Sequence, residues 1–305
     1  MIALAAATIA TYLLTPYISS FYLQMLTLAG INVVLANGLN LISGITGQLS
    51  LGHAGFMAIG AYASAYFSLQ YSDPNYFLLS LLLGGLFAGA FGLLLGLPTL
   101  RLKGDYLAIV TLGFSEMIRV LFLNMGSLGG ARGLPQIPHH TNLTWVVFAA
   151  AATLFFIHRW MNSYFGRAFL AIREDEMAAQ SCGVNTTKYK VMSFSLGAFF
   201  AGVAGALFAH QLTYISPSIF TFTKSFEILT MVVLGGLGSL SGATFSAILL
   251  TFLPEVLRPL QQITHIDLRM IIYSLLLIIL MLTRPTGIMG KREIWELIPW
   301  PKRKA

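Results

Sequence analysis

The sequence predicts an all-α polytopic membrane protein with about ten transmembrane helices, folded as a single domain over residues 1–305. Hydrophobic residues make up 56% of the 305 positions and charged residues only 10%, whereas soluble domains carry about 25% charged residues. Apolar runs close to the roughly 20 residues that a bilayer-spanning helix needs recur along the whole chain. No Pro/Ser-rich linker or separate soluble module interrupts them.

The first five predicted spans are separated by polar or glycine-rich breaks. They begin near residues 2, 21, 54, 76 and 105. GITGQLSLGHAG (44–55) leads into the third span, YSDPN (71–75) into the fourth and PTLRLKG (98–104) into the fifth. The first hundred residues contain no Lys or Arg. A secretory signal peptide needs a basic N-terminal region, so we expect the first span to be retained.

The other five predicted spans begin near residues 143, 191, 225, 242 and 268. Polar connectors lie between most of them, at 125–142, 159–190, 213–224 and 258–267. The eighth and ninth segments are short, so half-helices are an alternative to full spans there.

The basic residues predict the topology. The formal net charge is +7, but thirteen of the 18 Lys and Arg residues lie at 101–103, 159–190 and 284–305. The positive-inside rule assigns such segments to the cytoplasm, which makes both chain ends cytoplasmic and argues against nucleic acid as the partner. The lone cysteine, Cys182, excludes an intrachain disulfide and suits a reducing compartment.

Two glycine-rich stretches predict broken helices. GQLS (47–50) and GSLS (238–241) share one pattern and follow long apolar runs in opposite halves of the chain. Paired interruptions of this kind are typical of transporters with internal repeats, although small residues also simply let membrane helices approach closely. The expected break or hinge glycines are Gly44, Gly47, Gly52, Gly55, Gly235, Gly236, Gly238 and Gly242.

Polar side chains at these breaks are candidates for a translocation path, because polar groups are costly in hydrocarbon unless they face a cavity or satisfy broken backbone. The candidates are Gln48, Ser50, His53, Ser239 and Ser241. For His53 a structural hydrogen-bonding role is favoured over proton chemistry, since no acid lies nearby in the sequence.

Two charged residues, Glu116 and Arg119, lie three apart within the fifth predicted span. That spacing puts them on one helical face, so we expect an intramembrane ion pair, with gating of a pathway as the minor alternative. The loop that carries Arg132, His139 and His140 is interpreted as surface, because a metal site needs more ligands than the sequence offers. No metal site is expected.

The stretch REDEMAAQSCGVNTTKYK (173–190) predicts a short charged helix on the cytoplasmic side. It has good helix formers, acids in the first turn and a glycine suited to the helix end. A solvated loop is the alternative, but a stiff charged helix at the membrane face is suited to holding a cytoplasmic partner. The residues expected to do so are Glu174, Asp175, Glu176, Ala178, Ala179 and Gly183.

Five motifs together resemble the permease subunits of branched-chain amino acid ABC importers, in particular the M-type partner of the H/M pair. They are NLISGITGQLSLGHAGFMAIGAY (40–62), LRLKGDYLAIVTLGFSEMIR (100–119), GRAFLAIREDEMAAQSCGVNTTKYK (166–190), SPSIFTFTKSFEILTMVVLGGLGSLSG (216–242) and TRPTGIMG (283–290). The resemblance covers nearly the whole chain. It departs from the EAAxxxG motif of import permeases, because Glu176 lies one residue early and Met177 stands at the glutamate position.

The resemblance implies a subunit of the bacterial inner membrane that binds no cofactor itself. Its partners would be a homologous H-type permease, two cytoplasmic ATP-binding subunits that carry ATP and Mg²⁺, a periplasmic amino-acid-binding protein and membrane lipid. Residues 173–183 would dock the ATPase, and 125–142 and 213–224 would face the binding protein. The chain itself has no GxxxxGK[ST] phosphate loop.

Three alternatives remain open at the level of the sequence. The first is a related ABC permease for urea, short amides or a sugar, since specificity belongs largely to the binding protein. The second is an intramembrane hydrolase, although SLSG (239–242) lacks the first glycine of a GxSxG or GxSG nucleophile motif and HExxH is absent. The third is an uncoupled channel, which would conduct without ATPase subunits.

Overall fold

The computed structural model describes residues 19–71, 73–99, 102, 104–256, 275, 278–279, 282–283, 287–290 and 293. Within these residues the chain is helical, and its one β contact is an isolated antiparallel bridge between Leu134 and Ile215. The spans predicted near residues 2 and 268 lie outside the described residues.

Eight predicted helix starts fall within the described residues, and a helix begins within five residues of each. The first half contains α2 (Ser20–Asn40) with a π-helical turn (Leu41–Ile45), α3 (His53–Gln70), α4 (Phe77–Thr99) after a 3-10 turn (Pro74–Tyr76), α5 (Asp105–Asn124) and α6 (Leu143–Met161). The second half contains α7 (Tyr164–Glu174), α8 (Glu176–Ser181), α9 (Thr186–Leu212), α10 (Phe222–Gly235) and α11 (Leu240–Val256). Three further 3-10 turns lie at Gly126–Leu128, Gly130–Arg132 and Pro217–Ile219.

Five of the segments are long and apolar enough to cross a membrane, and Leu240–Glu255 is a shorter apolar helix. The five are Ser20–Ile45, Pro74–Pro98, Asp105–Asn124, Leu143–Met161 and Thr186–Leu212. The chain is therefore a polytopic α-helical membrane protein, and the total of ten spans stays a prediction. At 1.5 Å per residue the 14-residue α10 covers about 21 Å, less than a hydrocarbon core of about 30 Å.

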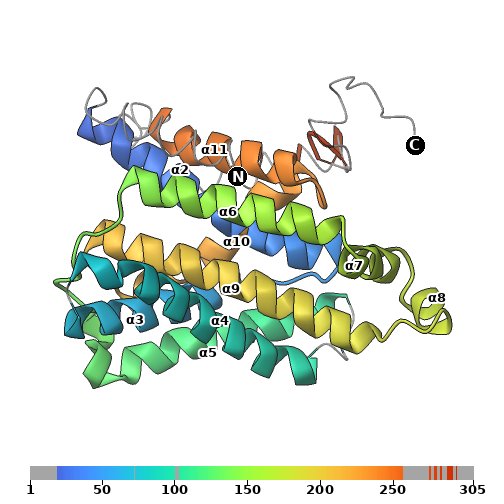
Figure 1. The fold of residues 1–305 in the computed structure, drawn as a ribbon, viewed down its shortest axis with the longest axis horizontal. Coiled ribbons are helices and arrows are strands. Elements are labelled where there is room, and N and C mark those ends of the chain that lie inside the picture. The colour runs from blue at the N-terminus through green and yellow to red at the C-terminus, as the bar shows by residue number, and fades with distance from the viewer. Residues whose placement is uncertain are drawn as a thin grey trace.

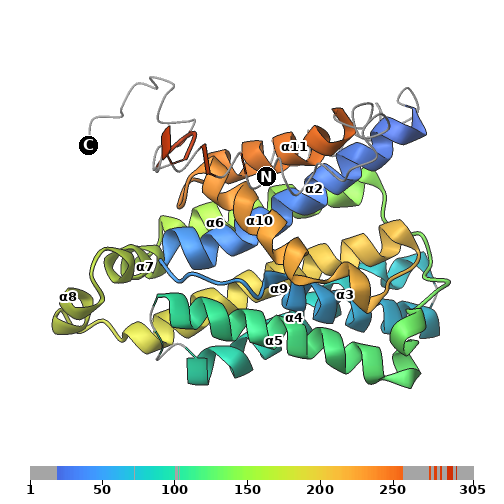
Figure 2. The same cartoon turned by 180° about the vertical axis from the view of Figure 1, so that it is seen from behind.

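The helices form two layers with α9 between them (Figure 1). α3, α4 and α5 lie on one side of α9, and α2, α6, α10 and α11 lie on the other, as the view from behind also shows (Figure 2). α2, α3 and α9 are the central helices, since most of their residues are buried inside the chain, whereas only five of the 19 residues of α6 are buried. α6 therefore presents most of its surface to lipid or to another subunit.

Glycines let α9 approach its neighbours closely. A methyl group at Gly60 of α3 would lie 2.3 Å from the Cα of Gly202 on α9, and one at Gly202 would lie 2.5 Å from the carbonyl oxygen of Gly84 on α4. Such close backbone contact is the usual basis of helix packing in lipid, where apolar burial between helices gives little driving force.

The connectors gather at opposite ends of the bundle. α7 and α8 project from one end, at the right of Figure 1, and the segments 125–142 and 213–221 lie at the other. At that second end Leu134 N donates to Ile215 O at 2.7 Å and Ile137 N donates to Thr213 O at 3.1 Å. The two connectors predicted to share one side of the membrane thus form one surface.

Candidate functional site

The first helix break lies between the π-helical turn and α3, over residues 46–52. Its backbone is satisfied within the protein: Gln48 N donates to Ile42 O at 3.0 Å, and Leu51 N donates to Thr111 Oγ1 of α5, also at 3.0 Å. Non-helical backbone inside a membrane needs such internal partners. Gly47 has φ +76°, a conformation that glycine adopts at little cost.

The second break lies between α10 and α11 and is shorter. Gly236 and Gly238 have φ +112° and +95°, so both positions favour glycine. Ser239 Oγ accepts from Gly242 N at 3.1 Å and so satisfies an amide in the first turn of α11. A methyl group at Gly235 would lie 2.4 Å from the carbonyl carbon of Gly242, so the two helices meet backbone to backbone here.

The two breaks are in direct contact, although about 200 residues separate them in the sequence. Asn40, the last residue of α2, accepts from Gly238 N through Oδ1 at 2.8 Å and donates to Ser239 O through Nδ2 at 3.0 Å. A methyl group at Gly44 would lie 2.3 Å from Gly238 N. The paired breaks, which we define as residues 40–52 and 235–242, therefore form one structural unit.

Arg173 at the end of α7 connects this unit to the predicted docking segment. Its Nη1 donates to Gly44 O at 3.0 Å, and its Nη2 pairs with Glu174 Oε1 at 3.0 Å. Its Cγ lies 3.0 Å from where a Cβ at Gly47 would stand, and Nη1 lies 2.7 Å from the corresponding position at Gly238. One guanidinium thus reaches both halves of the paired breaks.

Glu293 supports the second break from the C-terminal segment. Its carboxylate accepts from Leu240 N at 2.7 Å and Ser241 N at 3.0 Å, and from Ser241 Oγ at 2.5 Å. Amides at the first turn of a helix lack intrahelical partners, and an anion there is favoured by the helix dipole. Of the basic tail predicted at 284–305, the described residues therefore include one carboxylate that caps α11.

The translocation-path candidates are mostly buried within this chain. Gln48, Ser50, His53 and Ser239 have exposed fractions between 0% and 4%, and Ser241 is half-buried. Gln48 Nε2 lies 3.5 Å from Ser193 Oγ, while its Oε1 has no hydrogen-bond partner in the described part of the chain. Their contact with solute stays a prediction.

The glycines of the first break pack tightly as well as interrupting the helix. A methyl group at Gly52 would lie 2.4 Å from Thr111 O, and one at Gly55 would lie 2.8 Å from the Cα of Ser115, both on α5. These glycines therefore let the break and α3 pack closely against α5. Close packing was the second role that the sequence allowed for them. Their action as hinges stays a prediction.

Of the stretch 173–190, predicted as a short charged helix, only Glu176–Ser181 form the separate helix α8. Arg173 and Glu174 end α7, and residues 186–190 begin α9. Asp175 caps α8, its Oδ1 accepting from Met177 N at 2.8 Å and Ala178 N at 3.1 Å. Glu176 pairs with Lys190 of α9 at 2.5 Å, which fixes α8 to a central membrane helix. Ala178 and Gly183 are exposed, whereas Ala179 is buried.

Glu116 and Arg119 form an ion pair on α5, with Nε and Oε2 2.6 Å apart. Glu116 also accepts from Phe222 N through Oε1 at 3.1 Å, so it caps the first turn of α10. A carboxylate at a helix N-terminus is stabilising. The contact gives Glu116 a structural role that the spacing alone did not predict, and a gating role stays a prediction.

We expect Glu116→Ala to destabilise the protein more than Arg119→Ala. The first change removes both the ion pair and the cap of α10, and a lost cap costs about 1 kcal/mol, while a half-exposed ion pair contributes about 0.5 kcal/mol. Thermal unfolding of the purified variants in detergent measures the difference. Equal midpoint temperatures would show that the Phe222 contact contributes nothing.

Three residues of the site were missed by the sequence reasoning. Asn40 carried a readable signal, because an asparagine beside a predicted break within an apolar run needs a hydrogen-bond partner. Arg173 was included in the docking segment, but nothing in its neighbours pointed to Gly44. Glu293 lies in a tail that is mainly basic, and nothing in its sequence neighbours indicates that its carboxylate caps α11.

A family model described as a branched-chain amino acid transport system / permease component matches residues 21–281 of the chain. The "High-affinity branched-chain amino acid transport system permease protein LivM" of Escherichia coli (strain K12) is 38% identical over 298 residues, covering 86% of this chain and 68% of that protein. Its counterpart from Salmonella typhimurium is 37% identical with the same coverage. The Escherichia coli LivH permease protein is 26% identical, covering 90% of this chain and 97% of that protein. No solved structure matches.

Proposed function

Since the chain belongs to the family of permease components of branched-chain amino acid transport systems, we propose that it is a membrane subunit of an ABC importer that moves branched-chain amino acids across the bacterial inner membrane. The observation that carries the proposal is the LivM similarity over 86% of the chain. In this assembly the chain performs no chemistry. The energy comes from ATP and Mg²⁺ on two separate ATP-binding subunits.

The second permease subunit would be a LivH-like chain. The present chain is similar both to LivM and, more weakly, to LivH, which favours a pair of related permeases that enclose the path between them. The α7 and α8 end, which carries Arg173, Lys188 and Lys190, would face the cytoplasm by the positive-inside rule. Both chain ends would then also be cytoplasmic.

A periplasmic binding protein would deliver the amino acid at the opposite end. The joined connectors there offer it one continuous surface, since Leu134 and Ile215 form a backbone bridge and Tyr214 Oη donates to Arg132 O at 2.9 Å. Two loops held in one register can present a fixed shape to a partner, whereas two independent loops would have to be ordered at an entropic cost.

The proposed coupling runs from α8 through Arg173 to the paired breaks. Closure of the ATP-binding subunits displaces α8, which is tied to α9 by Glu176 and Lys190. Arg173, which lies three residues before the first residue of α8, moves with that helix and displaces Gly44 through its hydrogen bond to Gly44 O. Because Asn40 joins the two breaks, both respond together, and the polar groups now buried at Gln48 and Ser239 become available to solute.

Neutral donors suit a solute that carries both an ammonium and a carboxylate and has no net charge. Gln48, Ser50, Ser239 and Ser241 supply such donors. The unpartnered Gln48 Oε1 supports a role in another state, since a buried acceptor without a partner costs about 1–3 kcal/mol.

Reconstituted vesicles test the function. The permease pair with its ATP-binding subunits and binding protein should accumulate radiolabelled leucine only when ATP is present. Urea, short amides and sugars should not be accumulated at a comparable rate. Uptake of one of those solutes in place of leucine would move the assignment to a related permease, and leucine flux without ATP would favour an uncoupled channel.

The native cysteine tests the docking surface. Cys182 is exposed beside α8, so a thiol-directed crosslinker should capture an ATP-binding subunit from the unmodified chain. In a Cys182→Ser background, a cysteine at the exposed Ser218, on the opposite end, should capture the binding protein instead. If the ATP-binding subunit were captured only from position 218, the chain would lie in the membrane in the opposite orientation to the one proposed.

A further inference from the structure

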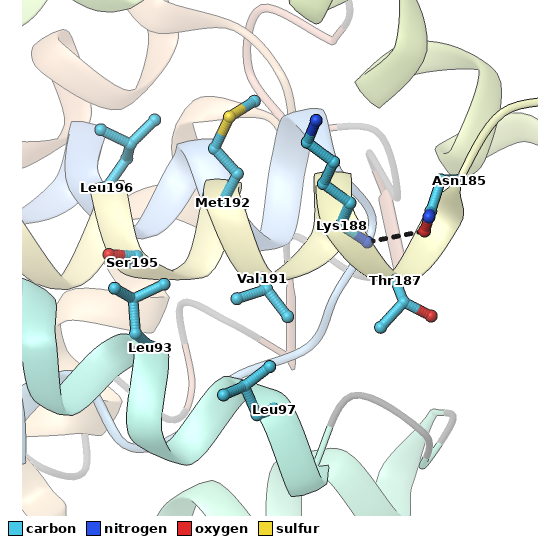
Figure 3. A pocket seen from close by; sticks show the side chains of 9 residues that line it. All are labelled: Leu93, Leu97, Asn185, Thr187, Lys188, Val191, Met192, Ser195 and Leu196. Atoms are coloured by element: carbon cyan, nitrogen blue, oxygen red, sulfur yellow. Dashed lines mark hydrogen bonds between the residues drawn. The ribbon is translucent and has the colours of Figure 1, made fainter.

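A groove between α4 and α9 lies at the end of the bundle that carries α7 and α8. Its volume is about 740 Å³, within the range of roughly 300–1,000 Å³ typical of ligand sites. Leu93 and Leu97 line it from α4, and Val191, Met192 and Leu196 line it from α9 (Figure 3). Both walls belong to helices long and apolar enough to span a membrane.

The groove is apolar along its length and cationic at its end. Lys188, Met192 and Leu196 all line the groove and follow one another along one side of α9, with Lys188 nearest the start of the helix (Figure 3). Residues spaced by four share a helix face. Moving from the helix start into the membrane, this face passes from a positive charge to two apolar side chains.

Two polar groups of the groove already make hydrogen bonds within the protein. Ser195 Oγ donates to Gly89 O at 2.9 Å, and Asn185 Oδ1 accepts from Lys188 N at 3.1 Å. An occupant of the deeper part therefore needs no hydrogen-bonding groups. An amino acid or nucleotide would leave its polar groups unpaired there, at a cost that hydrocarbon would not incur.

The Lys188 ammonium is available to an anion. Its side chain is exposed, and it has no ion pair in the part of the chain that the structure describes. The neighbouring Lys190 is by contrast neutralised by Glu176. The sequence also places Arg101 and Lys103 four and six residues after Leu97. A lysine near a bilayer surface attracts anionic lipid by about 1 kcal/mol.

We propose that this groove binds an anionic phospholipid of the membrane leaflet facing α7 and α8. One acyl chain lies along Leu93, Leu97, Met192 and Leu196, and the headgroup phosphate lies against the Lys188 ammonium. The positive charge of Lys188 favours an anionic lipid over the zwitterionic lipids that would cover any apolar helix face. Lys190, at the start of α9, also pairs with Glu176 of α8. A lipid bound beside Lys188 therefore stabilises the part of α9 that holds α8 in place.

Native mass spectrometry of the full-length chain, purified in mild detergent with the subunits that accompany it, tests the proposal. After exchange into mixed micelles of phosphatidylglycerol and phosphatidylcholine, the chain should retain phosphatidylglycerol preferentially. Lys188→Gln should lower that retention about fivefold, the equivalent of about 1 kcal/mol. Arg167→Gln is the matched control, because Arg167 is an exposed cation at the same end but does not line the groove.

A second variant tests the acyl-chain part of the site. Met192→Trp fills the groove without changing its charge and should also lower phosphatidylglycerol retention. Equal retention of both lipids, or an equal loss in the Lys188 and Arg167 variants, would overturn the proposal. A photoreactive group placed at position 192 gives a third test in native membranes. If it labelled another protein subunit and not lipid, a partner helix would occupy the groove and the proposal would be overturned.

Discussion

Replacing Arg173 with alanine should uncouple ATP hydrolysis from transport. The change removes the contact between the docking segment and Gly44 O, and a hydrogen bond to a charged group contributes about 1.5–3 kcal/mol. We expect the amount of leucine moved per ATP hydrolysed to fall about tenfold or more, because each 1.4 kcal/mol corresponds to a factor of ten. Parallel measurement of vesicle uptake and phosphate release gives this ratio.

Two further variants separate coupling from simple loss of a charge. Arg167→Ala removes an exposed cation from the same helix and should leave the ratio unchanged. Arg173→Lys keeps the charge but loses the planar fork that lets Nη1 reach Gly44 while Nη2 pairs with Glu174. It should resemble the alanine variant. A normal ratio in both Arg173 variants, with the complex intact, would remove Arg173 from the coupling route.

Gly44→Ala should separate the two breaks and destabilise the protein. The new methyl group would lie 2.0 Å from Asn40 Oδ1 and 2.3 Å from Gly238 N, and so would clash with both atoms of one hydrogen bond. Overpacking of this kind costs about 1–3 kcal/mol. Thermal unfolding in detergent should show a midpoint lowered by several degrees, and leucine uptake should fall with it.

Gly113→Ala is the matched control for that substitution. Gly113 lies inside α5, and a methyl group there would meet nothing within 4 Å. Since alanine favours a helix over glycine by about 1 kcal/mol, the midpoint should stay constant or rise. If both variants unfolded at the wild-type temperature, the tight contact between the breaks would be absent in the membrane protein.

The positions of the helices could be predicted from the sequence because hydrocarbon imposes a simple rule. A spanning helix needs about 20 apolar residues and polar groups collect at its ends, so α5 and α6 begin at the residues where the pattern predicted them. The separate helix α7 was not predicted. It mixes apolar and charged residues near the membrane face, where neither the spanning rule nor a solvent pattern applies.

The two breaks could be predicted from local signals, but their contact could not. Glycine at positions 47, 236 and 238 has positive φ, and repeated glycines within apolar runs indicate such positions. The Asn40 bond to Gly238 joins residues 198 positions apart, and no periodicity encodes that pairing. Burial of Gln48 and Ser239 likewise depends on which helices cover them, so a polar residue at a break does not by itself locate a solute path.

The central claim is that the paired breaks move during the ATP cycle and that Arg173 transmits the motion. Leu49 offers a direct probe, because it lies in the first break and is 37% exposed. In a Cys182→Ser background, the rate at which a water-soluble thiol reagent labels Leu49→Cys should change when the assembled importer binds ATP. The same change should be lost when Arg173→Ala is added. A labelling rate that ATP does not alter, or that ATP alters equally without Arg173, would contradict the account.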